Sequence, residues 1–231
     1  MNPTAIFFDA GNTLIFIDPR VVAPIFGDHG VDLSEEEFWD AEFQARVGLM
    51  KRVEDGAWGT EDHIWSEYFQ TLLRGCRVPE EQLEVVGQAL KDIHGVRHLW
   101  SYMHPSTPGA LEHLRSAGYR MAIISNADGR IEGRIEEAGI RDFFEFVLDS
   151  EVEGVEKPDP EIFLRACNRM GVDPSDSLYV GDLYPVDVVG ARTAGMKAVL
   201  MDPQGRLEYD VDSIPNVEAL PEYLARVSSR P

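Results

Sequence analysis

Short apolar runs that stop at polar or small residues recur along the chain and predict the strands of a parallel sheet. These runs lie at residues 5–8 (AIFF), 119–124, 145–148, 178–180 and 197–201. Apolar positions at helical spacing predict helices near residues 107–117, 129–138, 160–170 and 186–194. Strands that alternate with helices indicate βαβ units, so we expect a doubly wound α/β fold with a parallel sheet.

Residues from about 20 to 98 have a different pattern, with helical spacing and no convincing strand. Ser34 and Glu37 form a capping-box pattern at the start of one predicted helix, and two further helices begin near residues 60 and 79. This block therefore indicates a helical bundle inserted after the first strand. Residues 202–216 are polar and rich in Pro and Asp, and we expect a loop there.

The charge of the chain limits its partners. It has 231 residues, with 41 acidic and 21 basic side chains and a formal net charge of −20. Because a polyanion requires a basic surface, we expect neither nucleic acid nor an anionic membrane as a partner. A small anionic substrate requires a local positive site. The N-terminus lacks the basic segment of a signal peptide, and no apolar run is long enough to span a membrane. We expect a cytoplasmic protein, monomeric or homodimeric, with free thiols at Cys76 and Cys167.

Polar residues follow three of the predicted strands. They are Asp9, the pair Ser125 and Asn126, and the pair Gly181 and Asp182. Such residues are common in turns, which is the simpler interpretation of each loop alone. In open parallel sheets, however, ligands bind beyond the carboxyl ends of the strands. Their occurrence after three separate strands favours a shared site.

The acidic residues of this set call for a cation. Asp9 follows four apolar residues, and a carboxylate at the edge of a core is costly unless it is paired. Asp182 and Asp187 add two more carboxylates in the sequence GDLYPVD, and Lys157 lies just before a predicted helix. Oxygen ligands of this kind suit Mg²⁺. Together, Mg²⁺ and Lys157 balance the three carboxylates and leave donors for an anionic phosphoryl group.

Four motifs in this order resemble the haloacid dehalogenase-like hydrolase superfamily. They are DAGNT at residues 9–13, Ser125 with Asn126, Lys157 in a KPDP context, and GDxxxxD with Asp182 and Asp187. The resemblance implies an α/β core formed by residues 1–17 and 100–231. It also implies that the inserted block, residues 18–99, is the α-helical cap domain of that family.

The resemblance also implies a function, namely Mg²⁺-dependent hydrolysis of a small phosphorylated metabolite. Asp9 would attack phosphorus and form an aspartyl-phosphate, with Lys157 as the second catalytic residue. Ser125, Asn126 and Lys157 would bind the phosphoryl oxygens. Asp9, the main-chain carbonyl of Gly11, Asp182 and Asp187 would form the metal site. Covalent catalysis of this kind divides one displacement into two steps.

The chain departs from the family pattern at Gly11. Typical phosphatases of the family have DxDxT, where the second aspartate is the general acid and base, and glycine cannot perform either task. General acid and base catalysis contributes about 10²–10⁴-fold. The enzyme can be slow or prefer good leaving groups, Asp18 or His104 can supply the acid, or the chemistry can differ.

Three other activities remain open. Haloacid dehalogenases of the family also lack the second aspartate, but they use no metal, whereas GDLYPVD retains the metal pattern. Phosphonate hydrolases use a cap lysine as a Schiff base, for which Lys51 is the candidate. A catalytically impaired binding or regulatory protein is the third. Against it, the chain retains Asp9, Lys157 and Asp182, and unused charges of this kind are costly to bury.

Overall fold

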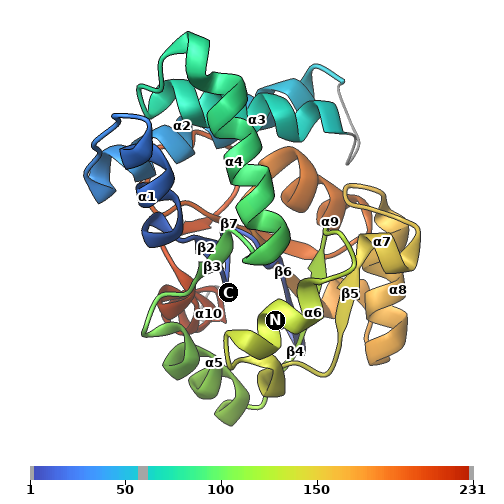
Figure 1. The fold of residues 1–231 in the computed structure, drawn as a ribbon. Helices are drawn as coiled ribbons and strands as arrows, with labels where there is room; N and C mark the ends of the chain where they lie inside the picture. Colours follow the sequence, from blue (N-terminus) through green and yellow to red (C-terminus); the bar gives the residue numbers. More distant parts are fainter. Residues whose placement is uncertain (1–2, 57–61, 229–231) are drawn as a thin grey trace. The chain divides into compact units, whose positions relative to one another are not determined.

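The chain divides into a core unit and a helical unit (Figure 1). The computed structural model describes residues 3–56 and 62–228, and for residues 62–65 the backbone alone. The core unit comprises Met1–Ile15 with Met103–Pro231, and the helical unit comprises Phe16–Tyr102. The inserted segment therefore begins and ends two to three residues outside the block of 18–99 expected from the sequence.

A six-stranded parallel sheet forms the centre of the core unit. Its order is β5-β4-β1-β6-β7-β8, so β1 lies between β4 and β6. The strands are β1 (Ala5–Phe8), β4 (Arg120–Ser125), β5 (Val147–Asp149), β6 (Ser177–Gly181), β7 (Lys197–Met201) and β8 (Ser213–Ile214). This sheet confirms the predicted α/β fold. The prediction that residues 202–216 form a loop is wrong in one detail, because this segment contains β8, which pairs with β7.

Helices cover the sheet of the core unit. They are α5 (Thr107–Ser116), α6 (Ile131–Glu137), α7 (Ser150–Glu153), α8 (Pro160–Met170), α9 (Val189–Thr193) and α10 (Leu220–Ser228). Helix α8 packs against α9, and α5 packs against α10 (Figure 1). Helix α10 was not predicted from the sequence. The helix predicted at 186–194 is instead a π-helical turn, η4 (Tyr184–Val188), followed by α9.

Alternate residues of the central strands form the main hydrophobic core. Phe7 of β1 and Ile124 of β4 pack with Phe163 of α8 in one buried cluster. The neighbouring Ile6 and Phe8, which point to the opposite face of the sheet, are also fully buried. A strand that is buried on both faces has an uninterrupted apolar sequence, as AIFF does.

The helical unit contains four α-helices and a short antiparallel ribbon within the part of it that the structure describes. The helices are α1 (Pro19–Asp28), α2 (Glu35–Glu54), α3 (Asp62–Gly75) and α4 (Leu83–Val96). The predicted capping box at Ser34 and Glu37 is present at the start of α2. The ribbon pairs β2 (Phe16–Ile17) with β3 (Trp100–Tyr102) and was not predicted. The expected start of α3 near residue 60 lies outside the described residues.

A buried carboxylate links two helices of this unit. Glu42 of α2 is 4% exposed and accepts a hydrogen bond from the Tyr68 hydroxyl of α3 at 3.1 Å. The guanidinium of Arg46, one turn along α2 and also buried, lies 3.6 Å from Glu42. Glu42 interrupts the apolar spacing of α2 because it serves as a polar contact inside the unit.

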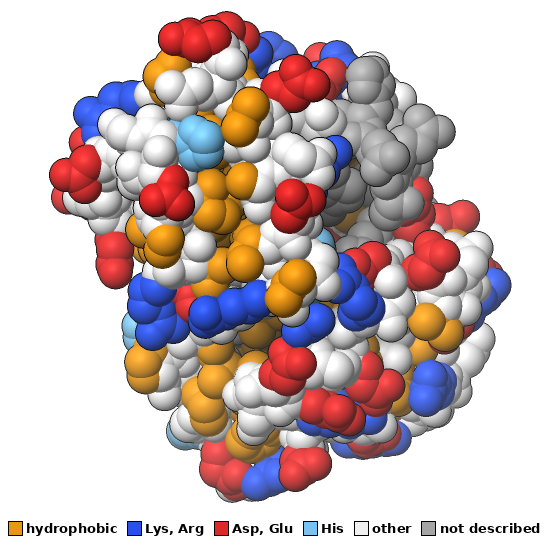
Figure 2. Space-filling model, viewed as in Figure 1, with side chains coloured by type: hydrophobic (Ala, Val, Ile, Leu, Met, Phe, Trp, Pro, Cys, Tyr) orange, Lys and Arg blue, Asp and Glu red, His pale blue; other side chains and the backbone are white. Residues whose placement is uncertain are grey.

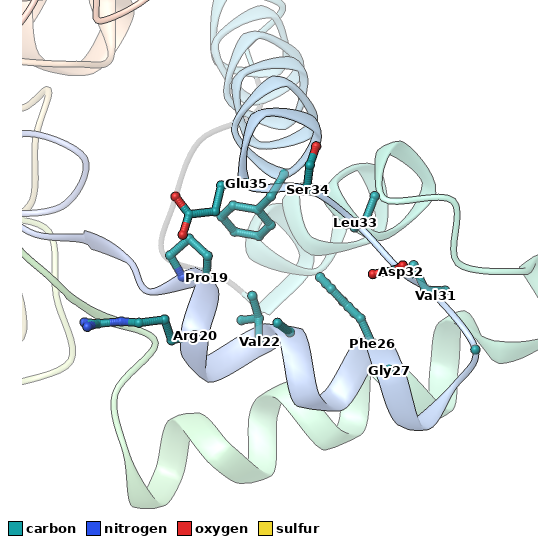
Figure 3. Close-up of a pocket in the computed structure, with 13 residues that line it drawn as sticks. Pro19, Arg20, Val22, Phe26, Gly27, Val31, Asp32, Leu33, Ser34 and Glu35 are labelled. Atoms are coloured by element: carbon teal, nitrogen blue, oxygen red, sulfur yellow. The ribbon is translucent and has the colours of Figure 1, made fainter.

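A cavity of about 440 Å³ lies between α1 and the start of α2 (Figure 3). Val22 and Phe26 of α1 and Phe38 of α2 supply its apolar lining, and Asp32 and Glu35 are the acidic residues around it. It is lined entirely by residues of the helical unit, and no residue of the predicted metal or phosphate site contributes to it.

The surface reflects the acidic composition. Acidic side chains are spread across the face shown in Figure 2. None of the helices in the described ranges combines the length and apolarity needed to cross a bilayer. Cys76 and Cys167 are buried and free, as expected.

Candidate active site

Asp9 lies directly beyond the carboxyl end of β1, the central strand of the core unit. Its main-chain N–H donates to the Val180 carbonyl of β6 at 2.8 Å, which continues the pairing between the two strands. The side chain of Asp9 is nearly buried, with the residue 7% exposed. The strand register therefore fixes the backbone of Asp9 and leaves only its side-chain torsions free.

Lys157 reaches Asp9 from the segment before α8. Its ammonium donates to Asp9 Oδ1 at 2.6 Å, to Asp187 Oδ1 at 2.7 Å and to the hydroxyl of Tyr179 at 2.8 Å. The residue is only 2% exposed. An ammonium group has three N–H donors, and here each has an acceptor. Lys157 is therefore a buried and fully hydrogen-bonded cation.

Asp187 is held in place by the turn that contains it. Its second carboxylate oxygen accepts from the Leu183 N–H at 2.9 Å, and its own N–H donates to the Leu183 carbonyl at 2.7 Å. Gly181 lies so close to Asp187 that a Cβ at position 181 would collide with the Asp187 carboxyl group. The glycine of the GDxxxxD motif thus provides room for the second acid of the same motif.

Asp182 completes a cluster of three buried carboxylates. One oxygen from each of Asp9, Asp182 and Asp187 lies within 4.8 Å of the others. With Lys157, this group has a formal charge of −2 when all four side chains are ionised. Hard oxygen donors at this spacing, with a charge that a divalent cation would neutralise, fit Mg²⁺. The donor set is therefore chemically suited to the metal expected from the sequence.

The electrostatic environment favours a charged lysine next to an aspartate that ionises near neutral pH. Burial raises the pKa of the Asp9 carboxyl to about 6, although the Lys157 ammonium opposes this shift. Burial alone would lower the pKa of Lys157, but the carboxylates of Asp187 and Asp9 outweigh it and raise that pKa. Lys157 is thus cationic, and Asp9 is mostly ionised at pH 7.

The remaining predicted site residues lie at the end of β4 and in the loops after β1 and β4. Ser125 is the last residue of β4 and is buried. The side chain of Asn126 brackets the main chain of Lys157, donating to its carbonyl at 2.9 Å and accepting from its N–H at 2.8 Å. Gly11 lies in a tight turn in which Asn12 adopts a φ of 51°. Asn126 therefore has a structural role in fixing Lys157.

The two candidates for a replacement acid have other contacts. Asp18 belongs to the helical unit, where it caps α1 and binds the Arg20 guanidinium through both carboxylate oxygens. His104 belongs to the core unit, where its ring lies 2.5 Å from the Ser106 hydroxyl and 3.4 Å from Glu218. Lys51, the candidate for a Schiff base, is exposed on α2.

Tyr179 is the site residue that the sequence analysis missed. It lies in the middle of β6, is fully buried, and contacts Lys157 through its hydroxyl group. Its position in the apolar run LYV is typical of a core aromatic residue, so the sequence pattern did not indicate a site residue there. The available signal was the polar hydroxyl, since a buried tyrosine hydroxyl usually has a hydrogen-bond partner.

This arrangement places the Asp9 carboxylate beside a buried cation. The second oxygen of Asp9 receives no hydrogen bond from Lys157, and three carboxylates surround a position suited to a cation. Positioning and charge neutralisation are the main requirements of phosphoryl transfer, and a carboxylate can act as its nucleophile. The geometry is therefore compatible with displacement at phosphorus by Asp9.

Comparisons with known proteins identify the family. A family model for haloacid dehalogenase-like hydrolases matches residues 3–195. The haloacid dehalogenase-like hydrolase domain-containing protein 3 of Mus musculus is 30% identical over 204 residues, which cover 84% of this chain and 78% of that protein. A glyceraldehyde 3-phosphate phosphatase of Methanothermobacter thermautotrophicus is 28% identical over 207 residues, 87% of this chain and 86% of that protein.

A solved structure agrees at the level of the fold. The magnesium-bound HAD-hydrolase YfnB of Bacillus subtilis superposes with a TM-score of 0.70 at 19% identity, covering 97% of this chain and 99% of that one. The order of the four motifs, the parallel sheet and the family match lead to the same assignment. The chain belongs to the haloacid dehalogenase-like hydrolase family and is a hydrolase.

Proposed function

We propose that the protein is a Mg²⁺-dependent phosphatase that forms an aspartyl-phosphate at Asp9. The observation that carries this proposal is the convergence of Asp9, Lys157, Asp182 and Asp187 at one edge of the sheet. The phosphatase of M. thermautotrophicus, aligned over most of this chain, supports a phosphorylated substrate. The substrate would be a small phosphorylated metabolite.

Asp9, the Gly11 carbonyl, Asp182 and Asp187 would hold Mg²⁺. When bound, the ion would neutralise negative charge on the phosphoryl group. The oxygen of Asp9 that Lys157 does not contact would attack phosphorus, and the bond to the leaving oxygen would break. Water would then attack the same phosphorus and release inorganic phosphate and the Asp9 carboxylate. Ser125, Asn126 and Lys157 would bind phosphoryl oxygens, for which Lys157 must first give up one of its present hydrogen bonds.

The residue at position 11 narrows the substrate class. Gly11 has no side chain that could donate a proton to the leaving oxygen. We therefore propose that the enzyme prefers phosphate compounds whose leaving group needs no protonation, such as acyl or aryl phosphates. The helical unit would act as the cap that selects among these substrates.

A turnover panel tests the proposal. Wild-type protein with Mg²⁺ should hydrolyse acetyl phosphate and p-nitrophenyl phosphate faster than an alkyl phosphate, and Asp9→Asn should abolish all three reactions. Gly11→Asp should raise the rate on the alkyl phosphate, by about 10²-fold or more if an acid and base is restored. Absence of Asp9-dependent and Mg²⁺-dependent turnover on every phosphate would contradict the proposal.

The same panel separates the alternative chemistry. Without metal, a 2-haloacid should not be hydrolysed, because the three-carboxylate cluster then retains its negative charge and repels a carboxylate substrate. Metal-independent release of halide that requires Asp9 would instead identify a dehalogenase. Binding of phosphorylated compounds without any turnover would indicate a regulatory protein.

A further inference from the structure

The hydroxyl group of Tyr179 is the third contact of the Lys157 ammonium and the only uncharged one. It accepts from Lys157 Nζ at 2.8 Å and donates to the Ile124 carbonyl of β4 at 3.0 Å. Because its single proton is directed at Ile124, a lone pair of the oxygen faces Lys157. The direction of the hydrogen bond from Lys157 to Tyr179 is therefore set by the positions of β4 and β6, each of which pairs with β1.

The position of Lys157 depends on anchors at both ends of its side chain. Its main chain is bracketed by the Asn126 amide at 2.8 and 2.9 Å. Its four-carbon stem is flexible by nature, so the main-chain contact alone does not fix the nitrogen atom. Asp9 follows β1 and Asp187 lies in the π-helical turn η4, whereas Tyr179 lies within the strand β6. Tyr179 is thus the one of the three partners whose main chain lies inside the sheet.

We propose that Tyr179 is a positioning residue for the reaction. Its hydroxyl holds the Lys157 ammonium so that, of the two oxygens of Asp9, the ammonium contacts only Oδ1. The other oxygen of Asp9 is then kept available for attack. This inference rests on the proposed function of Asp9 as the nucleophile. Without the hydroxyl, one ammonium N–H would lose its acceptor in a buried place, and the ammonium would turn further toward the two carboxylates.

The hydroxyl group can be separated from the packing of the ring. The Tyr179 ring contacts Phe163 edge to face, with centroids 5.0 Å apart and planes at 77°. A phenylalanine ring at position 179 retains the shape needed for this contact, so Tyr179→Phe removes chiefly the hydrogen bonds. Tyr119→Phe is the matched control. Tyr119 is only partly exposed and precedes β4, at the amino ends of the strands, whereas the site lies at their carboxyl ends.

Steady-state kinetics with acetyl phosphate and saturating Mg²⁺ test the inference. Tyr179→Phe should lower kcat by about 10- to 100-fold, as expected for a misplaced reacting group, while KM changes by less than about threefold. Tyr119→Phe should retain both constants. In a Lys157→Met background, Tyr179→Phe should have little further effect, because the residue acts through Lys157.

Several results would overturn the inference. One such result is an unchanged kcat in Tyr179→Phe. Another is that Tyr179→Phe lowers kcat in the Lys157→Met background by the same factor as in wild type. Either would show that Tyr179 does not act through Lys157, while leaving the proposed function intact. An inactive wild-type enzyme would overturn both. If Tyr179→Phe does not fold, the ammonium protons of ¹⁵N-lysine-labelled wild-type protein give a second test. Cross-relaxation between Lys157 and Tyr179 protons supports the inference, and its absence contradicts it.

Discussion

The ammonium nitrogen of Lys157 lies 2.6 Å from a carboxylate oxygen of Asp9, although 148 residues separate them in the chain. The fold of the core unit explains this proximity, because Asp9 directly follows β1 and the segment before α8 passes the same end of the sheet. Replacing Lys157 by Met should lower kcat by about 10²–10³-fold, since it removes a buried charge that would face the developing transition state in the proposed reaction. Initial rates with acetyl phosphate measure this effect.

The control for this variant is a lysine outside the site. Lys91→Met removes an exposed lysine of α4 and should leave kcat unchanged. Circular dichroism should show that both variants fold. Lys157→Met with wild-type activity would mean that the buried ammonium has only a structural role.

Gly181 provides a test of how Asp187 is positioned. A methyl group at position 181 would displace the Asp187 carboxylate, which lies against the glycine. Gly181→Ala should therefore weaken Mg²⁺ binding and destabilise the protein by about 1–3 kcal/mol, as overpacking in a core does. Calorimetric titration with Mg²⁺ and chemical unfolding measure the two effects.

Gly109 offers a matched comparison for that substitution. It lies in α5 of the same unit, and a Cβ there would meet no heavy atom within 4 Å. Gly109→Ala should retain Mg²⁺ affinity and should not lower stability. Equal Mg²⁺ affinity in Gly181→Ala and wild type would contradict the proposed role of Asp187 as a ligand.

The raised pKa of Asp9 predicts a pH dependence of metal binding. Burial raises this pKa to about 6, so Asp9 is increasingly protonated as the pH falls below that value. A protonated carboxyl must lose its proton to bind a metal, so the apparent dissociation constant for Mg²⁺ should rise as pH falls, approaching about tenfold per unit. Above pH 7 it should become nearly constant. Titrations from pH 5 to 8 measure this, and Asp9→Asn should lose the dependence.

Glu42 supports the helical unit independently of catalysis. Glu42→Ala removes the acceptor of the Tyr68 hydroxyl and the carboxylate beside the buried Arg46. Loss of one partner of a buried ion pair costs about 3–5 kcal/mol, so the free energy of unfolding of this unit should fall by that order. Urea unfolding followed by tryptophan fluorescence reports the change.

A conservative variant separates charge from hydrogen bonding at the same position. Glu42→Gln retains an acceptor for Tyr68 but removes the negative charge next to Arg46, and it should lie between Glu42→Ala and wild type. If Glu42→Ala is as stable as wild type, the buried contact contributes nothing measurable.

The sequence predicted the parts of the fold that depend on local pattern. Apolar runs located β1 and β7 at their observed bounds, and the capping box located the start of α2. It missed the two-residue strands β2 and β8, because their pairing depends on neighbours distant in the chain. Helix α1 was also missed, although Asp18 followed by Pro19 is an N-terminal signal.

For the site, the sequence predicted which charges converge but not how they are connected. Residues that directly follow strands grouped Asp9 with Asp182, because parallel strands bring their carboxyl ends together. Lys157 and Asp187 were added by the charge balance and by the resemblance to the family. Two connections are evident only in the structure, namely the contact of the Tyr179 hydroxyl inside an apolar strand and the Asn126 amide that brackets Lys157. Neither contact leaves a pattern in the sequence, because each depends on the direction in which a side chain points between segments that are distant in the chain.

In the proposed reaction, Asp9 accepts the phosphoryl group in a pocket completed by Mg²⁺. The most direct measurement is a crystal structure of the wild-type protein with Mg²⁺ and beryllofluoride, a mimic of the phosphoryl group. We expect beryllium bonded to a carboxylate oxygen of Asp9, with an ion held by Asp9, Asp182 and Asp187. Beryllofluoride that binds elsewhere, or an Asp9 that remains unmodified beside a bound ion, would contradict it.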